Sequence, residues 1–374
     1  MRVVLIVLSL MTCLTNAIAT ASPPQAESLV SCINSAAAEI GFHGVVYVRR
    51  GDLVVQKPYG MADAAEKMPI TAETRFNIGS AAKMFTAVAI ARLVDRGEVQ
   101  LDAPIGNYLA DLPPEFARIT IAQLLNHTSG LGDYFNMANK RVIDAAISAT
   151  DLLPLALATS PAFVPGSKRA YSNSGFVVLG AIVEKVSAMS YREFVQKEIL
   201  HPLGMSHTRF DPQDSAEPMT RMSPNGPLDK LQPSPLRQVR ASPAGGIFST
   251  ASDMSLLLTA LSNGRLVKRE TTQLFLEPRA DPGGGAGTYG FGFAVQTTPA
   301  VRVGHGGGAP GVNAEIALYP DSGWQLIALS NNDPPAASRM LSVLEHAAFS
   351  PDLPTACAQG LNDLAKTPGD PPQH

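Results

Sequence analysis

Residues 77–97 read NIGSAAKMFTAVAIARLVDRG, a stretch in which apolar side chains predominate. The pattern predicts a hydrophobic helix over residues 81–95, which Arg96 and Gly97 would end in the usual C-terminal fashion. Lys83 is unexpected in such a helix, because a buried ammonium group loses its hydration. Its presence therefore needs a chemical explanation.

Ser80 precedes Lys83 by three residues, so at helical spacing the two side chains share one face of the first turn. A serine hydroxyl is a poor nucleophile until a base removes its proton. Apolar neighbours and the positive end of a helix dipole both lower a lysine pKa from its ordinary value of about 10.4. The pair therefore predicts an activated serine. The structural alternative is that Ser80 caps the helix and Lys83 extends to water.

The chain has 374 residues and a formal net charge of −3, enough length for one large domain and no basic excess of the kind that nucleic-acid binding needs. Residues 1–21 predict a secretory signal peptide: Arg2 precedes a short apolar run, Val3 to Leu14, and small residues follow. We therefore expect a periplasmic or secreted protein with no membrane span in the mature chain.

Two cysteines remain after removal of the signal peptide, Cys32 and Cys357, one near each end of the mature chain. An even number of cysteines in an oxidising compartment favours a disulfide. The alternative is two separate buried thiols. A bridge would require the two ends of the chain to meet.

Strand-like segments lie near both ends of the chain. Residues 44–60 predict two strands joined by a turn at Gly51. Four later segments, separated by short turns, predict an antiparallel meander at 289–297, 301–307, 311–320 and 324–332. We therefore expect an α+β fold in which early and late strands form one antiparallel sheet. Helices at 29–40 and 334–348 would flank this sheet.

The middle of the chain is mainly helical. Helices are expected at 120–126, 142–158, 174–188, 192–199 and 251–263, and a long loop rich in proline, serine and glycine at 203–247. We predict a single domain over residues 29–350, with a sheet subdomain (29–79 plus 285–350) and an inserted helical subdomain (80–284). Residues 22–28 read as a loose leader, and the polar, proline-rich residues 360–374 as a disordered tail.

Two further segments contain residues suited to catalysis. PGSKRAYSNSGF, residues 165–176, places Tyr171 and Asn173 before an apolar helix, and GHGGGAPG, residues 304–311, places His305 before three glycines. Each has a structural alternative: a core tyrosine, a helix cap and a turn.

Two other patterns compete with these segments. Tyr134 begins a second Y-x-N, whose neighbours differ, and its side chain is a candidate for lining the cleft. His127 and Ser129 in NHTSG could form a separate pair, but we interpret NHTSG as a structural loop.

In this order, S-x-x-K at Ser80, Y-x-N at Tyr171 and His-x-Gly at His305 resemble the three motifs of the serine β-lactamase and penicillin-binding superfamily. The closest branch holds class C β-lactamases, D-alanyl-D-alanine carboxypeptidases, D-aminopeptidases and related esterases. LLNHTSGL (124–131) and ASPAGGIFSTASDM (241–254) are also similar to that branch, and the resemblance runs from about 36 to 348. It implies an antiparallel sheet flanked by helices, with the site between the sheet and the helical subdomain.

By matching position, the resemblance implies that Ser80 is the acyl-accepting nucleophile. Lys83 and Tyr171 would share the proton transfers, and which of them takes the serine proton is left open. Asn173 would hydrogen-bond Lys83 and a substrate amide or carbonyl, and His305 would face the site from the sheet.

The glycines after His305 have an implied role as well. The backbone N–H groups of Ser80 and Gly308 would form the oxyanion hole. Gly306, Gly307 and Gly308 would let a substrate carbonyl approach the strand, because side chains there would obstruct it.

The third motif departs from the Lys-Thr-Gly of many β-lactamases. Lysine is a permanent cation suited to a substrate carboxylate, whereas histidine is mostly neutral near pH 7. The departure lowers the expectation of efficient β-lactam hydrolysis and leaves esters, D-amino-acid amides and peptides open.

We therefore expect a secreted serine hydrolase that cleaves an ester or a D-amino-acid-containing amide or peptide through an acyl-enzyme on Ser80. The alternatives are a β-lactamase and a non-catalytic penicillin-binding sensor module. The seven histidines show no H-E-x-x-H, and no G-x-S-x-G is present, so we expect no metal and no cofactor. The sequence leaves the natural substrate and the oligomeric state open.

Overall fold

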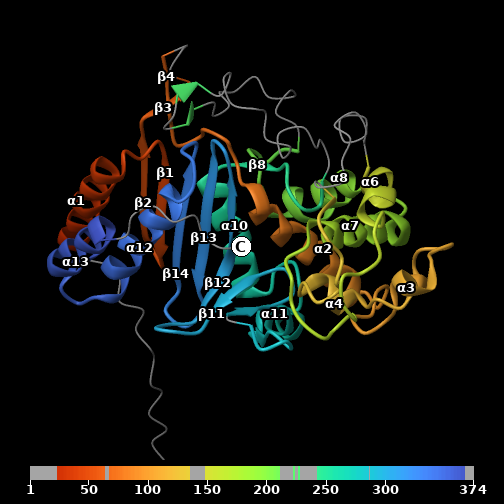
Figure 1. Ribbon diagram of the computed structural model, residues 1–374. Helices are drawn as coiled ribbons and strands as arrows, with labels where there is room; N and C mark the ends of the chain where they lie inside the picture. The colour runs from red at the N-terminus through yellow and green to blue at the C-terminus, as the bar shows by residue number, and fades with distance from the viewer. Residues whose placement is uncertain are drawn as a thin grey trace, which may run out of the picture.

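The computed structural model of the protein describes residues 23–63, 67–134, 148–210, 222–223, 226–227, 242–285 and 287–366. Its centre is an antiparallel sheet of eight strands in the order β2-β1-β14-β13-β12-β11-β10-β9 (Figure 1). The strands are β1 (Gly44–Arg50), β2 (Leu53–Tyr59), β9 (Arg279–Ala280), β10 (Thr288–Tyr289), β11 (Ala294–Gln296), β12 (Arg302–Ala309), β13 (Val312–Tyr319) and β14 (Trp324–Ser330).

Early and late strands pair side by side, as the sequence predicted. Val46 on β1 lies opposite Ala328 on β14, and β14 continues through β13 to β12 in an unbroken antiparallel run. The hairpin β1–β2 turns at Gly51, which has a positive φ of 57°. The α+β fold with one antiparallel sheet is therefore confirmed.

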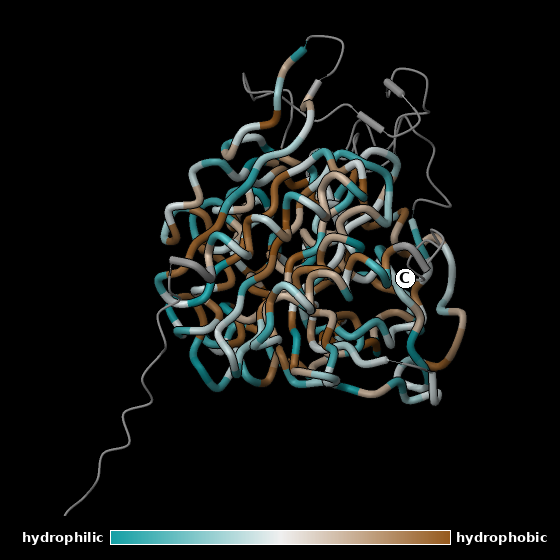
Figure 2. The backbone as a smooth tube through the Cα atoms, turned by 90° about the vertical axis from the view of Figure 1, so that its left-hand side faces the viewer, coloured by the Kyte–Doolittle hydropathy of each residue, from teal (hydrophilic) through white to brown (hydrophobic). Residues whose placement is uncertain are grey.

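Each face of the sheet packs on a separate hydrophobic core. On one face, Val46, Leu326 and Ala328 pack with α1 (Pro23–Ile40), α12 (Ala336–Phe349) and α13 (Leu353–Lys366). On the other, Val45, Ile327 and Leu329 join the core of the helical half of the molecule. This alternation follows from the period of two in a strand, which sends successive side chains to opposite faces. Figure 2 shows the hydrophobic segments gathered in the interior.

The helical half lies beside the sheet and surrounds α2 (Figure 1). Its helices are α2 (Lys83–Asp95), α3 (Pro114–Ala117), α4 (Ile121–Leu125), α6 (Ala149–Ala156), α7 (Asn173–Ser187), α8 (Tyr191–Val195), α9 (His201–Leu203), α10 (Ala251–Asn263) and α11 (Arg269–Leu276). The shorter elements are the 3₁₀ turns η1 (Gly79–Ala82) and η2 (Ile105–Asn107) and the π-helical segment η4 (Gln196–Leu200). Small strand pairs are β3 (Met61–Asp63) with β4 (Met68–Pro69), β5 (Phe76–Asn77) with β8 (Phe248–Ser249), and β6 (Met222–Ser223) with β7 (Gly226–Pro227).

The hydrophobic helix predicted over residues 81–95 is confirmed as α2. Every residue from Lys83 to Ala91 is buried, because α2 is packed against α7, α8 and α11 and has no solvent-facing stripe over that span. The prediction missed one detail. The first turn is the 3₁₀ turn η1, so Ser80 precedes the α-helix proper.

Other helix predictions hold with shifted ends. The helix expected at 142–158 is seen as α6, where Ser148 and Asp151 form a capping box, and residues 142–147 lie outside the described residues. The helix expected at 192–199 is divided between α8 and η4. Helix α11 was not predicted. Its short sequence RETTQLFL contains two β-branched threonines, which weaken the helical signal.

Both chain ends are more ordered than predicted. Residues 23–28 belong to α1, so the loose leader is wrong there, and proline at the start of a helix is well tolerated. The disordered tail is wrong for residues 360–366, which complete α13. Buried Cys357 and Leu364 give this helix an apolar face against α1 and α12. Residues 367–374 lie outside the described residues.

Three other predictions involve segments outside the described residues. They are the signal peptide at 1–21, most of the long loop at 203–247, and the tail beyond Lys366. No described helix is both long enough and apolar enough to cross a membrane. The division into a sheet subdomain and a helical subdomain stays a prediction.

A disulfide joins Cys32 on α1 to Cys357 on α13. The two cysteines are 325 residues apart in the sequence, so the bridge closes nearly the whole described chain into one loop. Restricting so long a loop in the unfolded chain is worth about 2–5 kcal/mol.

We therefore expect the Cys32→Ala/Cys357→Ala protein to lose about 2–5 kcal/mol of unfolding free energy, because its unfolded chain regains that freedom. Urea denaturation of the oxidised protein and the double variant measures the difference. The single variant Cys357→Ala should match the double variant. Equal stability of all three proteins would contradict a stabilising bridge.

Candidate active site

Ser80 lies on a turn that is wedged against the sheet. Gly79 has a positive φ of 51°, and a Cβ built on it would lie 3.1 Å from the amide nitrogen of Gly308 on β12. A Cβ built on Gly307 would lie 2.0 Å from the carbonyl oxygen of Ile78. Only glycines allow the turn and the strand to approach so closely. This close packing holds the partly exposed Ser80 beside β12.

Lys83 follows one turn later, and its side chain is completely buried. Its Nζ lies 3.3 Å from the hydroxyl of Ser80, and it donates to Oδ1 of Asn173 at 2.6 Å and to the carbonyl oxygen of Ala244 at 2.9 Å. The rings of Tyr171 and Phe176 lie 4.8 and 5.5 Å from Nζ. The amine is thus enclosed by oxygens and aromatic faces, and the Lys83 side chain does not extend to water.

Burial lowers the pKa of Lys83 to about 7, although the negative charge of Asp133 acts in the opposite direction. An ammonium group loses hydration in the interior, and the few polar contacts around it only partly replace that hydration. At neutral pH, a substantial fraction of the molecules therefore carries an uncharged amine beside Ser80.

Asn173 is the first residue of α7, and its side chain points inward. The preceding Ser172 caps the helix by accepting from the backbone N–H of Gly175 at 2.9 Å. The amide of Asn173 is thereby left available for other partners. Its Oδ1 accepts from Lys83, and its Nδ2 donates to Oδ2 of Asp133 at 2.6 Å.

Tyr171 lies against the same amine, with its hydroxyl oxygen buried. Burial raises the pKa of its phenol, and the hydroxyl of Ser80 opposes this as a hydrogen-bonding partner. The ring packs on His127 with centroids 4.4 Å apart. His127 also accepts from the backbone N–H of Ser172 at 3.2 Å, so it contacts two successive residues of the Y-S-N segment.

His305 occupies β12 on the same face of the sheet as Gly307, and it is 6% exposed. Its Nδ1 lies 2.6 Å from the carbonyl oxygen of Gly306, which can only accept, so this nitrogen carries a hydrogen. In the neutral ring, Nε2 then accepts from the hydroxyl of Tyr289 at 2.8 Å. His305 is held by protein groups on both nitrogens.

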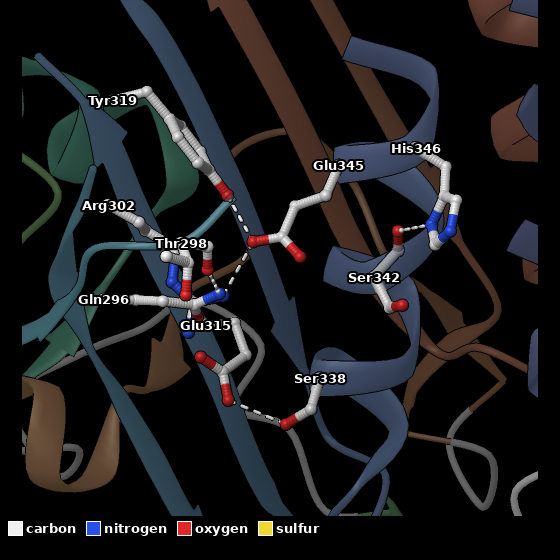
Figure 3. Close-up of polar contacts among 9 residues, drawn as sticks. All are labelled: Gln296, Thr298, Arg302, Glu315, Tyr319, Ser338, Ser342, Glu345 and His346. Atoms are coloured by element: carbon white, nitrogen blue, oxygen red, sulfur yellow. Dashed lines mark hydrogen bonds and ion pairs between the residues drawn. The ribbon is translucent and has the colours of Figure 1, made fainter. Parts of the chain in front are cut away.

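Gly306 faces the other side of the sheet. A Cβ built on it would lie 3.0 Å from Oε1 of Glu315, which accepts from the hydroxyl of Ser338 on α12. Figure 3 shows this cluster, in which Glu345 also pairs with Arg302 at 2.7 Å. Burial raises the pKa of Glu315. The side-chain position of Gly306 therefore lies on the face opposite Ser80, and Gly307 serves the packing of the serine turn.

The structure brings Ser80, Lys83, Tyr171 and Asn173 together around one buried amine, with Gly308 beside the serine turn. His305 does not contact this amine within the described hydrogen bonds and ring contacts. It reaches Tyr171 through the rings of Tyr289 and His127, which are 4.7 Å apart.

Four contributors were not predicted as site residues. They are Asp133, the carbonyl of Ala244, His127 and Tyr289. The signals for His127 were the similarity of LLNHTSGL to the family and the possible pair with Ser129, which we interpreted as a structural loop. Tyr289 lies in the segment 289–297, which was predicted as a strand. Tyr134, a candidate for lining the cleft, is instead fully buried, and its hydroxyl bonds Oγ of Ser242 at 3.0 Å.

No group of three or more histidine, cysteine, aspartate or glutamate side chains that could hold a metal ion occurs within the described residues. The polar groups around Lys83 are an amide, a backbone carbonyl and hydroxyls. Such a set is suited to proton transfer at a serine.

Comparison with known proteins places this site in context. A sequence model of the Beta-lactamase family matches residues 31–347. Penicillin-binding protein 4* of Bacillus subtilis (strain 168) is 29% identical over 330 residues, which cover 82% of this chain and 72% of that protein. Esterase EstB of Burkholderia gladioli is 32% identical over 261 residues, covering 66% of this chain and 61% of the esterase.

Solved structures agree with these relatives. A penicillin binding protein from Bacillus halodurans superposes with a TM-score of 0.74 at 27% identity, covering 84% of this chain and 98% of that chain. D-amino acid amidase from Ochrobactrum anthropi SV3 shares the fold, with a TM-score of 0.73 at 24% identity over 92% of this chain and 100% of the amidase. The expected resemblance and fold are confirmed, and the chain belongs to the Beta-lactamase family, with a penicillin-binding protein and an esterase among its relatives.

Proposed function

We propose that the protein is a serine hydrolase that cleaves an ester or a D-amino-acid-containing amide through an acyl-enzyme on Ser80. The observation that carries the proposal is the buried amine of Lys83, 3.3 Å from the Ser80 hydroxyl, with its pKa lowered to about 7. A general base works best when its pKa lies near the working pH. A lysine with only a structural role would not need a lowered pKa beside a serine hydroxyl.

Lys83, and not Tyr171, takes the serine proton in this proposal. Burial lowers the pKa of the amine and raises that of the phenol, so only the amine is available as a base near neutral pH. A neutral amine has two hydrogens and one lone pair. Asn173 Oδ1 and the Ala244 carbonyl take the two hydrogens, which directs the lone pair to the Ser80 hydroxyl.

The acylation step follows from this arrangement. Ser80 Oγ bonds to the substrate carbonyl carbon while its proton passes to Lys83 Nζ. The backbone N–H groups of Ser80 and Gly308 would stabilise the oxyanion, as the close approach of Gly79 to the Gly308 amide nitrogen supports. When the intermediate collapses, the bond to the leaving group breaks. The Tyr171 hydroxyl, which has Ser80 as a hydrogen-bonding partner, passes a proton to the departing oxygen or nitrogen and regains one from the ammonium.

Deacylation reverses these roles. Water attacks the acyl carbon, its proton goes to the neutral amine, and the acid product leaves as Ser80 recovers its hydrogen. The net reaction is the addition of one water across the ester or amide bond.

The burial and hydrogen bonds of His305 favour esters and amides over β-lactams as substrates. A β-lactam carries a carboxylate, which a cationic side chain in the third motif would bind. His305 is buried, and both its ring nitrogens already have protein partners. The name of one relative, an esterase, and that of a protein with the same fold, a D-amino acid amidase, favour the same substrates.

Export to the periplasm or beyond is part of the proposal. It is supported by the signal-peptide pattern at residues 1–21 and by the Cys32–Cys357 disulfide, because such bonds persist in oxidising compartments.

A panel of purified substrates tests the substrate class. We expect p-nitrophenyl acetate or a D-amino-acid p-nitroanilide to be hydrolysed with a kcat/KM at least about 100-fold above that for a chromogenic cephalosporin. Each missing ionic contact to a carboxylate costs roughly 1.5–3 kcal/mol, so a gap of this size is reasonable. A D-Ala-D-Ala peptide completes the panel.

Two outcomes would contradict the proposal. Preferred turnover of the cephalosporin would make the protein a β-lactamase. Turnover of no substrate, together with no labelling by a fluorophosphonate, would make it a sensor module. The His305→Lys variant is a matched control, because it places at this position the cation that many β-lactamases have in the third motif.

A further inference from the structure

Both acceptors of the Lys83 amine are held by the segment HTSGLGDY, residues 127–134, here called the 127–134 loop. Asp133 accepts from the Asn173 amide at 2.6 Å. Tyr134 bonds Ser242, whose Oγ accepts from the N–H of Ala244 at 3.1 Å. Consecutive residues of one loop therefore support the two oxygens that receive the amine hydrogens.

The contact with Asp133 decides which way the Asn173 amide faces. An ionised carboxylate can only accept hydrogen bonds, so the amide NH₂ must point to Asp133. The amide oxygen must then point to Lys83, as the 2.6 Å distance from Nζ to Oδ1 shows. A flipped amide would present hydrogens to the amine and would occupy the lone pair that Ser80 needs.

We propose that Asp133 is a positioning residue that fixes the amide of Asn173 and so directs the lone pair of the Lys83 amine toward Ser80. This inference rests on the proposed function only where it concerns catalysis. Asp133 itself is partly exposed and does not contact the amine, so it acts through Asn173.

Asp133 has an electrostatic effect as well. Its negative charge raises the pKa of Lys83 against the effect of burial. The other titratable or charged groups around the site are Tyr171, whose ring contacts the amine, and His127, whose pKa is lowered by burial and by the charges of Lys83, His305 and Arg169. Asp133 is the group whose charge acts on the pKa of Lys83 against burial.

Titration of Lys83 by NMR tests the inference without relying on activity. The protein is labelled with ¹³Cε-lysine, and Lys83→Met assigns the Lys83 signal by its disappearance. We expect a wild-type midpoint near pH 7. In Asp133→Asn, we expect the midpoint to fall by about 0.5–1 pH unit, because a charge roughly two hydrogen bonds away is lost. Asp281→Asn is the control. It removes another partly exposed carboxylate, one with no effect on the pKa of Lys83, and the Lys83 midpoint in this variant should match the wild type.

Fluorophosphonate labelling at pH 9 tests the orientation of the amide separately, because Lys83 is neutral there in every variant. We expect Asp133→Ala to react about tenfold more slowly than wild type, as the amide loses its charged acceptor. Asp133→Asn keeps an acceptor oxygen and should remain within about threefold. Thermal unfolding of both variants checks that they fold.

The inference is overturned if the Lys83 midpoint in Asp133→Asn equals that of wild type, if Asp281→Asn shifts it as far, or if Asp133→Ala labels at the wild-type rate at pH 9. Failure of the proposed function looks different. In that case the wild type takes no label on Ser80, while the NMR midpoint still moves with Asp133.

Discussion

Replacing Ser80 by alanine is expected to lower kcat/KM by at least about 10⁴-fold and to leave the protein folded. Ser80 supplies the oxygen that bonds to the acyl carbon, and no other hydroxyl in the site lies so close to the Lys83 amine within the described residues. Removing a nucleophile from a group that acts as a unit removes most of the rate enhancement. Ester hydrolysis and thermal unfolding of the variant measure both parts.

The fold should tolerate this change because Ser80 is partly exposed and makes no helix cap. Ser338→Ala is a matched control: this serine lies on α12, on the opposite face of the sheet, and its loss should leave kcat/KM unchanged. Hydrolysis by the Ser80→Ala protein within tenfold of wild type would place the chemistry on another residue.

Replacing Lys83 by methionine is expected to cost a similar factor at pH 7 to 8, because the serine then has no base. The wild-type kcat/KM should fall below about pH 7 as the amine takes up a proton, in line with its lowered pKa. The residual kcat/KM of Lys83→Met should not show this fall below pH 7. A pH–rate profile from 5 to 9.5 measures both. A wild-type profile that is flat from pH 5 to 9 would contradict a lysine base.

The pH dependence of the unfolding free energy is a second measure of the lowered pKa of Lys83. The folded pKa of about 7 lies below the unfolded value, so between pH 7 and about 10.4 the unfolded chain binds a proton that the folded protein lacks. The destabilising effect of Lys83 is therefore complete below pH 7 and is relieved as the pH rises. Relative to Lys83→Met, the wild type should gain about 2 kcal/mol of unfolding free energy between pH 7 and 9, measured by urea denaturation.

Much of the fold could be predicted from the sequence because its signals are local. The β1–β2 hairpin, the late meander and the buried helix α2 each depend on apolar spacing and turn residues within a few positions. The order of α13 was missed because its apolar face contacts α1, a helix from the other end of the chain.

The site could be predicted only in part. Ser80 and Lys83 are neighbours in sequence, and a lysine in an apolar helix is visible without a structure. Asp133 bonds Asn173 across 40 residues, and the Ala244 contribution is a backbone carbonyl, which carries no side-chain signature. The glycine at 307 was assigned to substrate approach, but the Ile78 backbone fills that space. Long-range packing and backbone groups leave little trace in a single sequence.

The most direct test of the central claim is to find which residue a fluorophosphonate modifies. The protein is labelled at pH 8, digested, and its peptides are sequenced by mass spectrometry, with Lys83→Met treated in parallel. We predict a single adduct on Ser80 in the wild type and a large loss of that adduct in Lys83→Met. An adduct on another residue, or equal labelling of Ser80 without the amine, would contradict activation of Ser80 by Lys83.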